Sequence, residues 1–232
     1  MLLRPSVQGR ARRRQTGWLL LCITLGFLLA LVARASWDFD LVLQNAERRH
    51  GPLGMARERI EAWSDLIDTS GRLSERDKLG AVNHFFNRQI RFSDDARVWQ
   101  QNDYWATPVE ALIKGAGDCE DYSIAKYFTL RRLGVPSERL RITYVKALRQ
   151  NQAHMVLTYY ATPDADPLVL DNLVGEIHPA SRRQDLLPVY AFNAEGLYLP
   201  GQHGRRSDSK KLSRWQDLLK KMRAEGFAIG EG

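Results

Sequence analysis

Cys119 is the residue of this sequence best suited to chemistry. It is the only cysteine outside the N-terminal apolar segment, and a helix-like run follows it. A thiol in the first turn of a helix lies near free backbone N–H groups and the positive end of the helix dipole, which favour the thiolate. Asp118, Glu120 and Asp121 act in the opposite direction, because nearby negative charge disfavours a second anion. A bound cation would remove this conflict.

Two residues further along the chain could work with this thiol. A nucleophilic cysteine needs an imidazole that exchanges protons with it and a third group that orients the imidazole. His154 opens one predicted strand and Asp171 ends the next, so a hairpin would bring them to the same edge. We therefore predict that Cys119, His154 and Asp171 form a catalytic triad. The alternatives are a buried inert thiol, an ordinary strand histidine and a turn-forming aspartate.

Three acids in four positions surround the cysteine. Helix capping accounts for one or two of them, because acids favour the first turn of a helix. Carboxylates around a glycine-rich loop also suit a hard divalent cation. The run does not match an EF-hand loop, so spacing alone does not identify the ion. We predict that Asp118, Glu120 and Asp121 bind calcium and that activity requires it.

The elements before the cysteine are predicted to be mainly helical. Apolar residues recur at helical spacing within 36–73 and again after Ser74, which starts a capping-box-like pattern. Thr107 followed by proline marks another helix start, and a further helix runs from near Cys119 to Leu133. By contrast, Ile90 to Trp105 is predicted to be an aromatic and polar loop that either anchors the core or lines a substrate groove.

The elements after it are predicted to be mainly strands. Leu140 to Val145, His154 to Tyr160 and Leu168 to Asp171 are rich in β-branched and aromatic residues, and Val189 to Leu199 predicts a further strand pair. A polar basic loop, 202–209, precedes the last helix, whose apolar stripe ends near Gly226. We expect that helix to pack on the domain with Lys220 and Lys221 solvated; a membrane-surface or partner role is the alternative.

The net charge of +7 belongs mostly to the N-terminus. Residues 1–35 hold six arginines and no acid, and the remainder has 28 basic and 27 acidic residues. No stretch interleaves basic and aromatic residues, so nucleic-acid binding is not supported.

Residues 1–35 also resemble an export signal. Trp18 to Ala33 is an uncharged apolar run, and Ala33-Arg34-Ala35 resembles a cleavage site. A retained N-terminal anchor is the alternative. Lipidation of Cys22 is not expected, because Leu21 stands where a small residue is needed. We predict one domain, 36–232, outside the cytoplasm.

Several separated blocks resemble a known family. The run DYWATPVEALIKGAGDCEDYSIAKYFTLRRLGVP is followed in order by RITYVKA, AHMVLTYY and PLVLDNL. Together they resemble the LapG-type bacterial transglutaminase-like cysteine proteinases over about residues 75–200. The resemblance implies an α+β, papain-like or transglutaminase-like fold with a helical N-terminal lobe packed on an antiparallel sheet. It implies the triad at Cys119, His154 and Asp171, and calcium at Asp118, Glu120 and Asp121.

The resemblance also implies a biological setting. Proteins of this family are periplasmic endopeptidases that cut the N-terminal region of a large, LapA-like surface adhesin after paired alanines, which disperses biofilm. An inner-membrane receptor of the LapD type sequesters them when it binds cyclic di-GMP. Two other functions remain open from the residues themselves. One is a transglutaminase-type acyl transferase with the same triad, and the other is a non-catalytic calcium-binding adaptor.

Overall fold

The computed structural model describes residues 37–199 and 212–229. Contacts divide the chain between Trp37 and Asp38, and the second unit holds the helices and strands of the fold. The predicted leader and the loop 202–209 lie outside the described residues. Within the part that is described, no helix is long and apolar enough to cross a membrane.

The N-terminal half is helical, as predicted. Its helices are α2 (Phe39–His50), α3 (Met55–Ser70), α4 (Glu75–Gln89), α5 (Asp95–Val98), α6 (Pro108–Lys114) and α7 (Cys119–Arg132). Two of the predicted starts are capped by side chains. Ser74 accepts a hydrogen bond from the Asp77 N–H at 3.2 Å. Thr107 and Glu110 form a reciprocal capping box in which each side chain accepts from the other's N–H.

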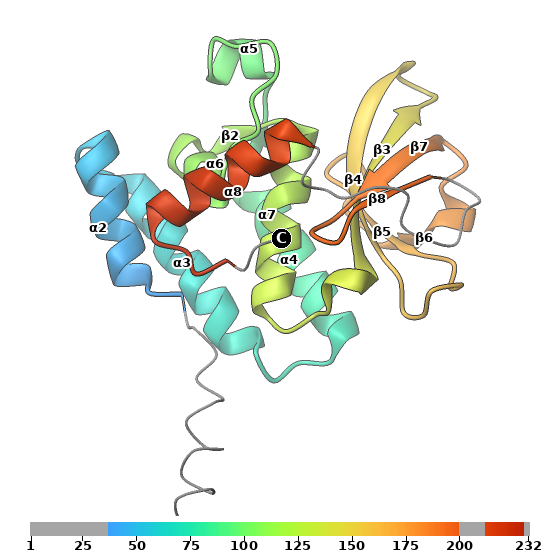
Figure 1. The fold of residues 1–232 in the computed structure, drawn as a ribbon, viewed down its shortest axis with the longest axis horizontal. Helices are drawn as coiled ribbons and strands as arrows, with labels where there is room; N and C mark the ends of the chain where they lie inside the picture. The colour runs from blue at the N-terminus through green and yellow to red at the C-terminus, as the bar shows by residue number, and fades with distance from the viewer. Residues whose placement is uncertain (1–36, 200–211, 230–232) are drawn as a thin grey trace, which may run out of the picture. The chain divides into compact units, whose positions relative to one another are not determined.

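The C-terminal half forms an antiparallel sheet with strand order β6-β5-β4-β3-β7-β8. Its strands are β3 (Leu140–Ala147), β4 (Gln152–Tyr159), β5 (Leu168–Leu170), β6 (His178–Pro179), β7 (Leu186–Phe192) and β8 (Leu197–Tyr198). All four predicted strand segments are therefore confirmed, and β6 is an addition. Helices on one side and this sheet on the other give the α+β fold (Figure 1).

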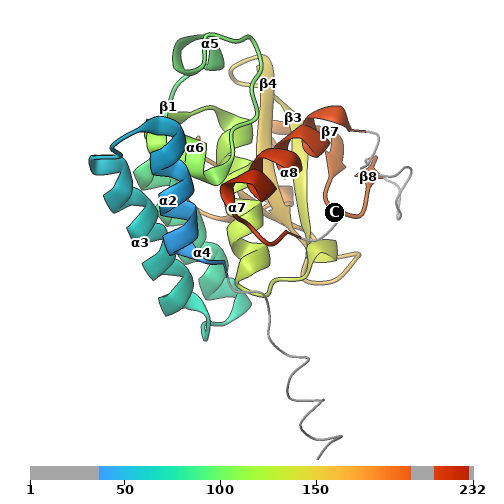
Figure 2. The same cartoon turned by 60° about the vertical axis from the view of Figure 1, so that its left-hand side comes forward.

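Helix α7 lies between the helical part and the sheet (Figures 1 and 2). It packs against α4 and α6 on one side and against β4 and β3 on the other. Its residues from Asp121 to Leu130 are all buried, which fits a helix covered on several faces. Its first residue, Cys119, therefore stands at the junction of helices and sheet.

The predicted loop from Ile90 to Trp105 contains regular structure. It includes α5 and the short strand β1 (Arg91–Phe92). Strand β1 pairs in parallel with β2 (Ala116–Gly117), with Arg91 opposite Ala116. This pairing brings the residues after β1 beside the residues after β2, which include the cysteine.

The last helix, α8 (Ser213–Glu225), packs on the domain as expected. Trp215 is fully buried and contacts the rings of Tyr127 and Phe128 on α7 and of Phe192 on β7. The expectation for Lys221 was wrong. Its Nζ hydrogen-bonds the Trp105 carbonyl at 2.6 Å and Glu110 at 2.9 Å, so it anchors the loop before α6.

Candidate active site

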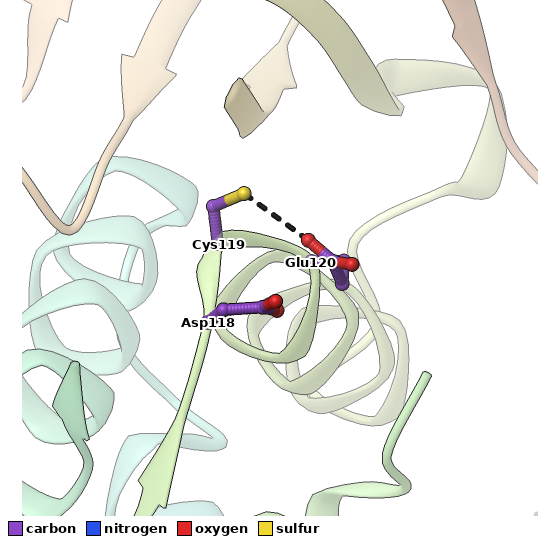
Figure 3. Close-up of side chains that lie close together, drawn as sticks. All are labelled: Asp118, Cys119 and Glu120. Atoms are coloured by element: carbon purple, nitrogen blue, oxygen red, sulfur yellow. Dashed lines mark hydrogen bonds between the residues drawn. The ribbon is translucent and has the colours of Figure 1, made fainter. Parts of the chain in front are cut away.

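Two glycines determine how the chain reaches Cys119. Gly115 ends α6 with φ of 58°, a conformation that favours glycine. A Cβ on Gly117 would lie 2.5 Å from Oδ2 of Asp121, so only glycine allows that carboxylate to fold back under the loop. Cys119 then begins α7 (Figure 3). The helix start places backbone N–H groups beside the sulfur.

His154 and Asp171 meet as the hairpin predicted. In the β4–β5 register Leu157 is opposite Leu170, which places Asp171 on the same face as His154 and diagonal to it. The imidazole Nε2 lies 2.8 Å from Asp171 Oδ1, and both side chains are buried. Burial alone would raise the pKa of Asp171, but the hydrogen bond and charge of His154, with bonds from Leu173 and Arg183, lower it to about 2.

An ionised Asp171 fixes the histidine tautomer. A carboxylate can only accept, so Nε2 carries the proton of this hydrogen bond. The other ring nitrogen, Nδ1, is left to act as a base or acid.

Cys119 and His154 line one cavity of about 460 Å³. Tyr144, Tyr190 and Trp105 supply aromatic wall, and the rings of Tyr144 and Tyr190 stack at 5.1 Å. Two other lining side chains, Phe92 and Leu173, are apolar and more than 40% exposed. The cavity is large enough for a peptide segment and offers it both apolar and polar groups.

The thiol has the unfavourable electrostatics that the sequence suggested. Cys119 Sγ donates a hydrogen bond of 3.1 Å to Glu120 Oε2 (Figure 3). Burial raises the pKa of the thiol, and the charge of Glu120 and this hydrogen bond raise it further. A backbone hydrogen bond with Met155 acts in the opposite direction but does not outweigh them.

The acid cluster is larger than predicted. Asp118, Glu120 and Asp121 are joined by Asp95 and Asp103, in overlapping groups whose ligand atoms lie within 4.8 Å of one another. Parallel pairing of β1 with β2 explains the proximity of Asp95 to Asp118. Asp95 and Asp103 were not predicted as ligands. The only hint in the sequence was that both lie in the aromatic and polar segment before Thr107.

Ionising all of these carboxyl groups without a counter-ion is energetically unfavourable, because some of them are buried and they repel one another. Burial, followed by the charges of Glu120 and Asp121, raises the pKa of Asp118 to about 10. Burial raises the pKa of Asp95 to about 6 and that of Asp121 well above its ordinary value. The buried Oδ1 atoms of Asp118 and Asp95 have no hydrogen-bond partner. Buried oxygens of this kind fit a hard divalent cation.

Capping also explains part of the cluster. Asp121 is fully buried, and its oxygens accept from the Ala106 N–H at 2.8 Å and the Asp118 N–H at 3.3 Å. Asp121 therefore has a structural role besides any contact with an ion.

Comparison with known proteins places this site in a family. The family model of bacterial transglutaminase-like cysteine proteinases matches residues 63–185. Three solved structures of Legionella pneumophila LapG are 46% identical to this chain and cover 78% of it. The first and the calcium-bound form have a TM-score of 0.68 and are covered over 97% and 98% of their length. The EGTA-treated form has a TM-score of 0.70 and is covered over 97%.

The comparison with curated proteins found no match. The family model spans more than half of the chain and includes the cysteine, the histidine and the aspartate. The chain belongs to the bacterial transglutaminase-like cysteine proteinases and is a cysteine protease.

Proposed function

We propose that this protein is a calcium-dependent cysteine endopeptidase with Cys119 as nucleophile, His154 as acid and base, and Asp171 as the group that orients the imidazole. The observation that carries this proposal is the 2.8 Å hydrogen bond between Asp171 and His154, because His154 lines the same cavity as Cys119.

The proposed reaction follows from these positions. His154 Nδ1 accepts the thiol proton while Sγ attacks the carbonyl carbon of the scissile peptide. Collapse of the tetrahedral intermediate breaks the C–N bond, and His154 returns the proton to the leaving amine. Water then hydrolyses the thioester with His154 as the base. Backbone N–H groups at the start of α7 are placed to stabilise the developing oxyanion.

Calcium binding is proposed at Asp95, Asp103, Asp118, Glu120 and Asp121. Bound there, calcium would neutralise the acids that oppose the Cys119 thiolate. Three observations support this proposal: the raised pKa values of Asp95 and Asp118, their unpartnered oxygens, and the likeness to a LapG that has been solved in a calcium-bound form.

The substrate, compartment and partner are proposed from the family resemblance. We propose a periplasmic enzyme that cleaves the N-terminal region of a large LapA-like adhesin after paired alanines, releasing the adhesin and dispersing biofilm. An inner-membrane LapD-like receptor that binds cyclic di-GMP would hold it inactive. The arginine-rich leader before residue 36 supports export.

The test is mass spectrometry of a purified N-terminal adhesin fragment after incubation with the enzyme. We expect two products with calcium and intact fragment with excess chelator. Cys119→Ala should be folded by circular dichroism and inactive, whereas Met55→Ala, which changes an exposed side chain on α3, should cleave normally. Cleavage by the Cys119→Ala variant would refute the nucleophile, and full cleavage in chelator would refute the calcium requirement. A labelled amine added to the mixture identifies acyl transfer if it is incorporated without scission.

A further inference from the structure

Asp171 is held from two sides. His154 occupies Oδ1, which also accepts the Leu173 N–H at 3.0 Å. The Arg183 guanidinium donates from Nη2 to Oδ2 at 2.8 Å. Among the described residues, these three groups supply the hydrogen bonds of the Asp171 side chain. Each carboxylate oxygen therefore has a fixed partner, and the carboxylate cannot rotate without breaking a bond.

Arg183 is itself rigidly placed. It follows a short 3-10 helix, Ala180–Arg182, and its side chain is only 5% exposed. Its Nε lies 3.0 Å from Asp185 Oδ1, and its Nη2 lies 2.9 Å from Asp185 Oδ2. This two-point contact with a second carboxylate sets the plane of the guanidinium, which a single ammonium group could not do.

Lys126 is another cation whose charge acts on Asp171. It lies on α7, two turns after the cysteine, and is fully buried. Burial lowers the pKa of Lys126 to about 7, although the charge of Asp171 acts to raise it. Within the described part of the chain, Lys126 makes no hydrogen bond to Asp171, so Arg183 is the cation that can set the orientation of the carboxylate.

We propose that Arg183, held by Asp185, is a positioning residue for the triad. It acts through Asp171, keeping Oδ1 aimed at the imidazole, and it is not among the residues that line the cavity. The proposal rests on the proposed function, because Asp171 is taken as the group that orients His154. It adds two side chains to the predicted triad, so that Asp185, Arg183, Asp171 and His154 form a continuous series of hydrogen bonds.

The test compares Arg183→Gln, Arg183→Lys and Asp185→Asn with wild type in the calcium-loaded enzyme. We expect kcat to fall by about tenfold or more in Arg183→Gln with KM nearly unchanged, because the lost group orients the base and does not bind substrate. Arg183→Lys keeps the charge but not the two-point contact, so its kcat should recover in part. Asp185→Asn keeps the buried pair of Arg183 and Asp171 and should show a smaller loss.

A second readout does not depend on turnover. In ¹⁵N-histidine-labelled protein, the proton on Nε2 of His154 should give a low-field resonance from its hydrogen bond to Asp171. Arg183→Gln should shift or abolish this resonance. Arg139→Gln is the control, because it also breaks an arginine–carboxylate pair, with Glu75 at 2.8 Å, but at a partly exposed position. It should leave both kcat and the resonance unchanged.

The outcomes separate the two proposals. If Arg183→Gln folds, keeps its resonance and cleaves at the wild-type rate, the positioning role is overturned while the protease stands. If wild type cleaves no peptide but the resonance still depends on Arg183, the proposed function fails and the positioning contact stands. Removing one partner of a buried ion pair can unfold a protein. If Arg183→Gln unfolds, the test uses Arg183→Lys and Asp185→Asn instead. If their kcat falls only in proportion to their melting temperature and the His154 resonance does not change, the positioning role of Arg183 is overturned.

Discussion

Glu120 is the residue that connects the thiol to the acid cluster. Its carboxylate accepts a hydrogen bond of 3.1 Å from the Cys119 thiol. The same carboxylate also lies with those of Asp95 and Asp103 in one cluster of possible metal ligands. An ion bound by that group would compete for the same carboxylate oxygens. The state of Cys119 and the occupation of the proposed calcium site are therefore linked through one side chain.

Replacing Glu120 with glutamine should make Cys119 more reactive in the metal-free protein. The carboxylate raises the pKa of the thiol through its charge and its hydrogen bond, and the amide carries no charge. A pKa lower by one gives about ten times more thiolate wherever the thiol is mostly protonated. We expect faster alkylation by iodoacetamide at pH 8, measured by mass spectrometry of the Cys119 peptide.

Wild type with added calcium should also be alkylated faster than wild type without it, and Glu120→Gln should lose most of this response. Asp68→Asn, which removes an exposed acid on α3, is the control and should behave as wild type. Equal alkylation rates for metal-free wild type and Glu120→Gln would show that Glu120 does not restrain the thiol.

At the scale of the elements, Trp215 is a fully buried side chain through which α8 packs on the rest of the fold. Its indole contacts aromatic rings on both α7 and β7, so one side chain joins the helix that begins at Cys119 to the sheet. The adjacent Arg214 lines the cavity and pairs with Asp103. The docking of α8 therefore affects the edge of the active site as well as the core.

Trp215→Ala should destabilise the protein by about 3–5 kcal/mol, the usual cost of emptying a fully buried aromatic site. Trp215→Phe should cost much less, because the buried indole nitrogen has no hydrogen-bond partner to lose. The free energy of unfolding from urea titrations followed by circular dichroism measures both. Equal losses of unfolding free energy in the two variants would mean that the ring contacts of Trp215 do not hold α8 in place.

The sequence was sufficient for those elements whose signals are local. The caps at Ser74 and Thr107 were predictable because the bonded groups lie three residues apart. The β4–β5 hairpin was predictable because a turn rich in proline and aspartate separates two strand-like runs. The β1–β2 pair could not be predicted, because strands of two residues show no periodicity and the paired residues are far apart in the sequence. Asp95 and Asp103 were missed for the same reason.

Charged residues that pair across distant elements were also beyond sequence reasoning. Lys221 was expected in solvent, since its helix has an apolar face and a basic face. Its contacts with Trp105 and Glu110 depend on how α8 crosses the start of α6. The pairing of Arg183 with Asp171 likewise needs the turn after β6.

At the scale of the whole molecule, we expect the acid cluster to make stability depend on both pH and the proposed calcium ion. A carboxyl whose pKa is raised by folding binds more protons in the folded than in the unfolded state. Stability is then lost as the pH rises from the ordinary carboxyl value, about 4, to the raised value. Asp95, raised to about 6, and Asp118, raised to about 10, both act in this direction. An ion that binds only the folded state stabilises it by mass action.

The melting temperature of metal-free protein should therefore fall between pH 5 and pH 8, and calcium should reduce this fall, so the gain from calcium grows with pH. Scanning calorimetry on protein stripped of metal by chelator and desalting, with and without added calcium, measures both curves. The Glu225→Gln variant distinguishes the effect of the acid cluster from that of Glu225, whose pKa is also raised. Burial raises the pKa of Glu225 on α8 to about 8, so this variant should lessen the fall with and without calcium alike. Curves with and without calcium that run parallel from pH 5 to pH 8 would show that calcium does not neutralise these acids.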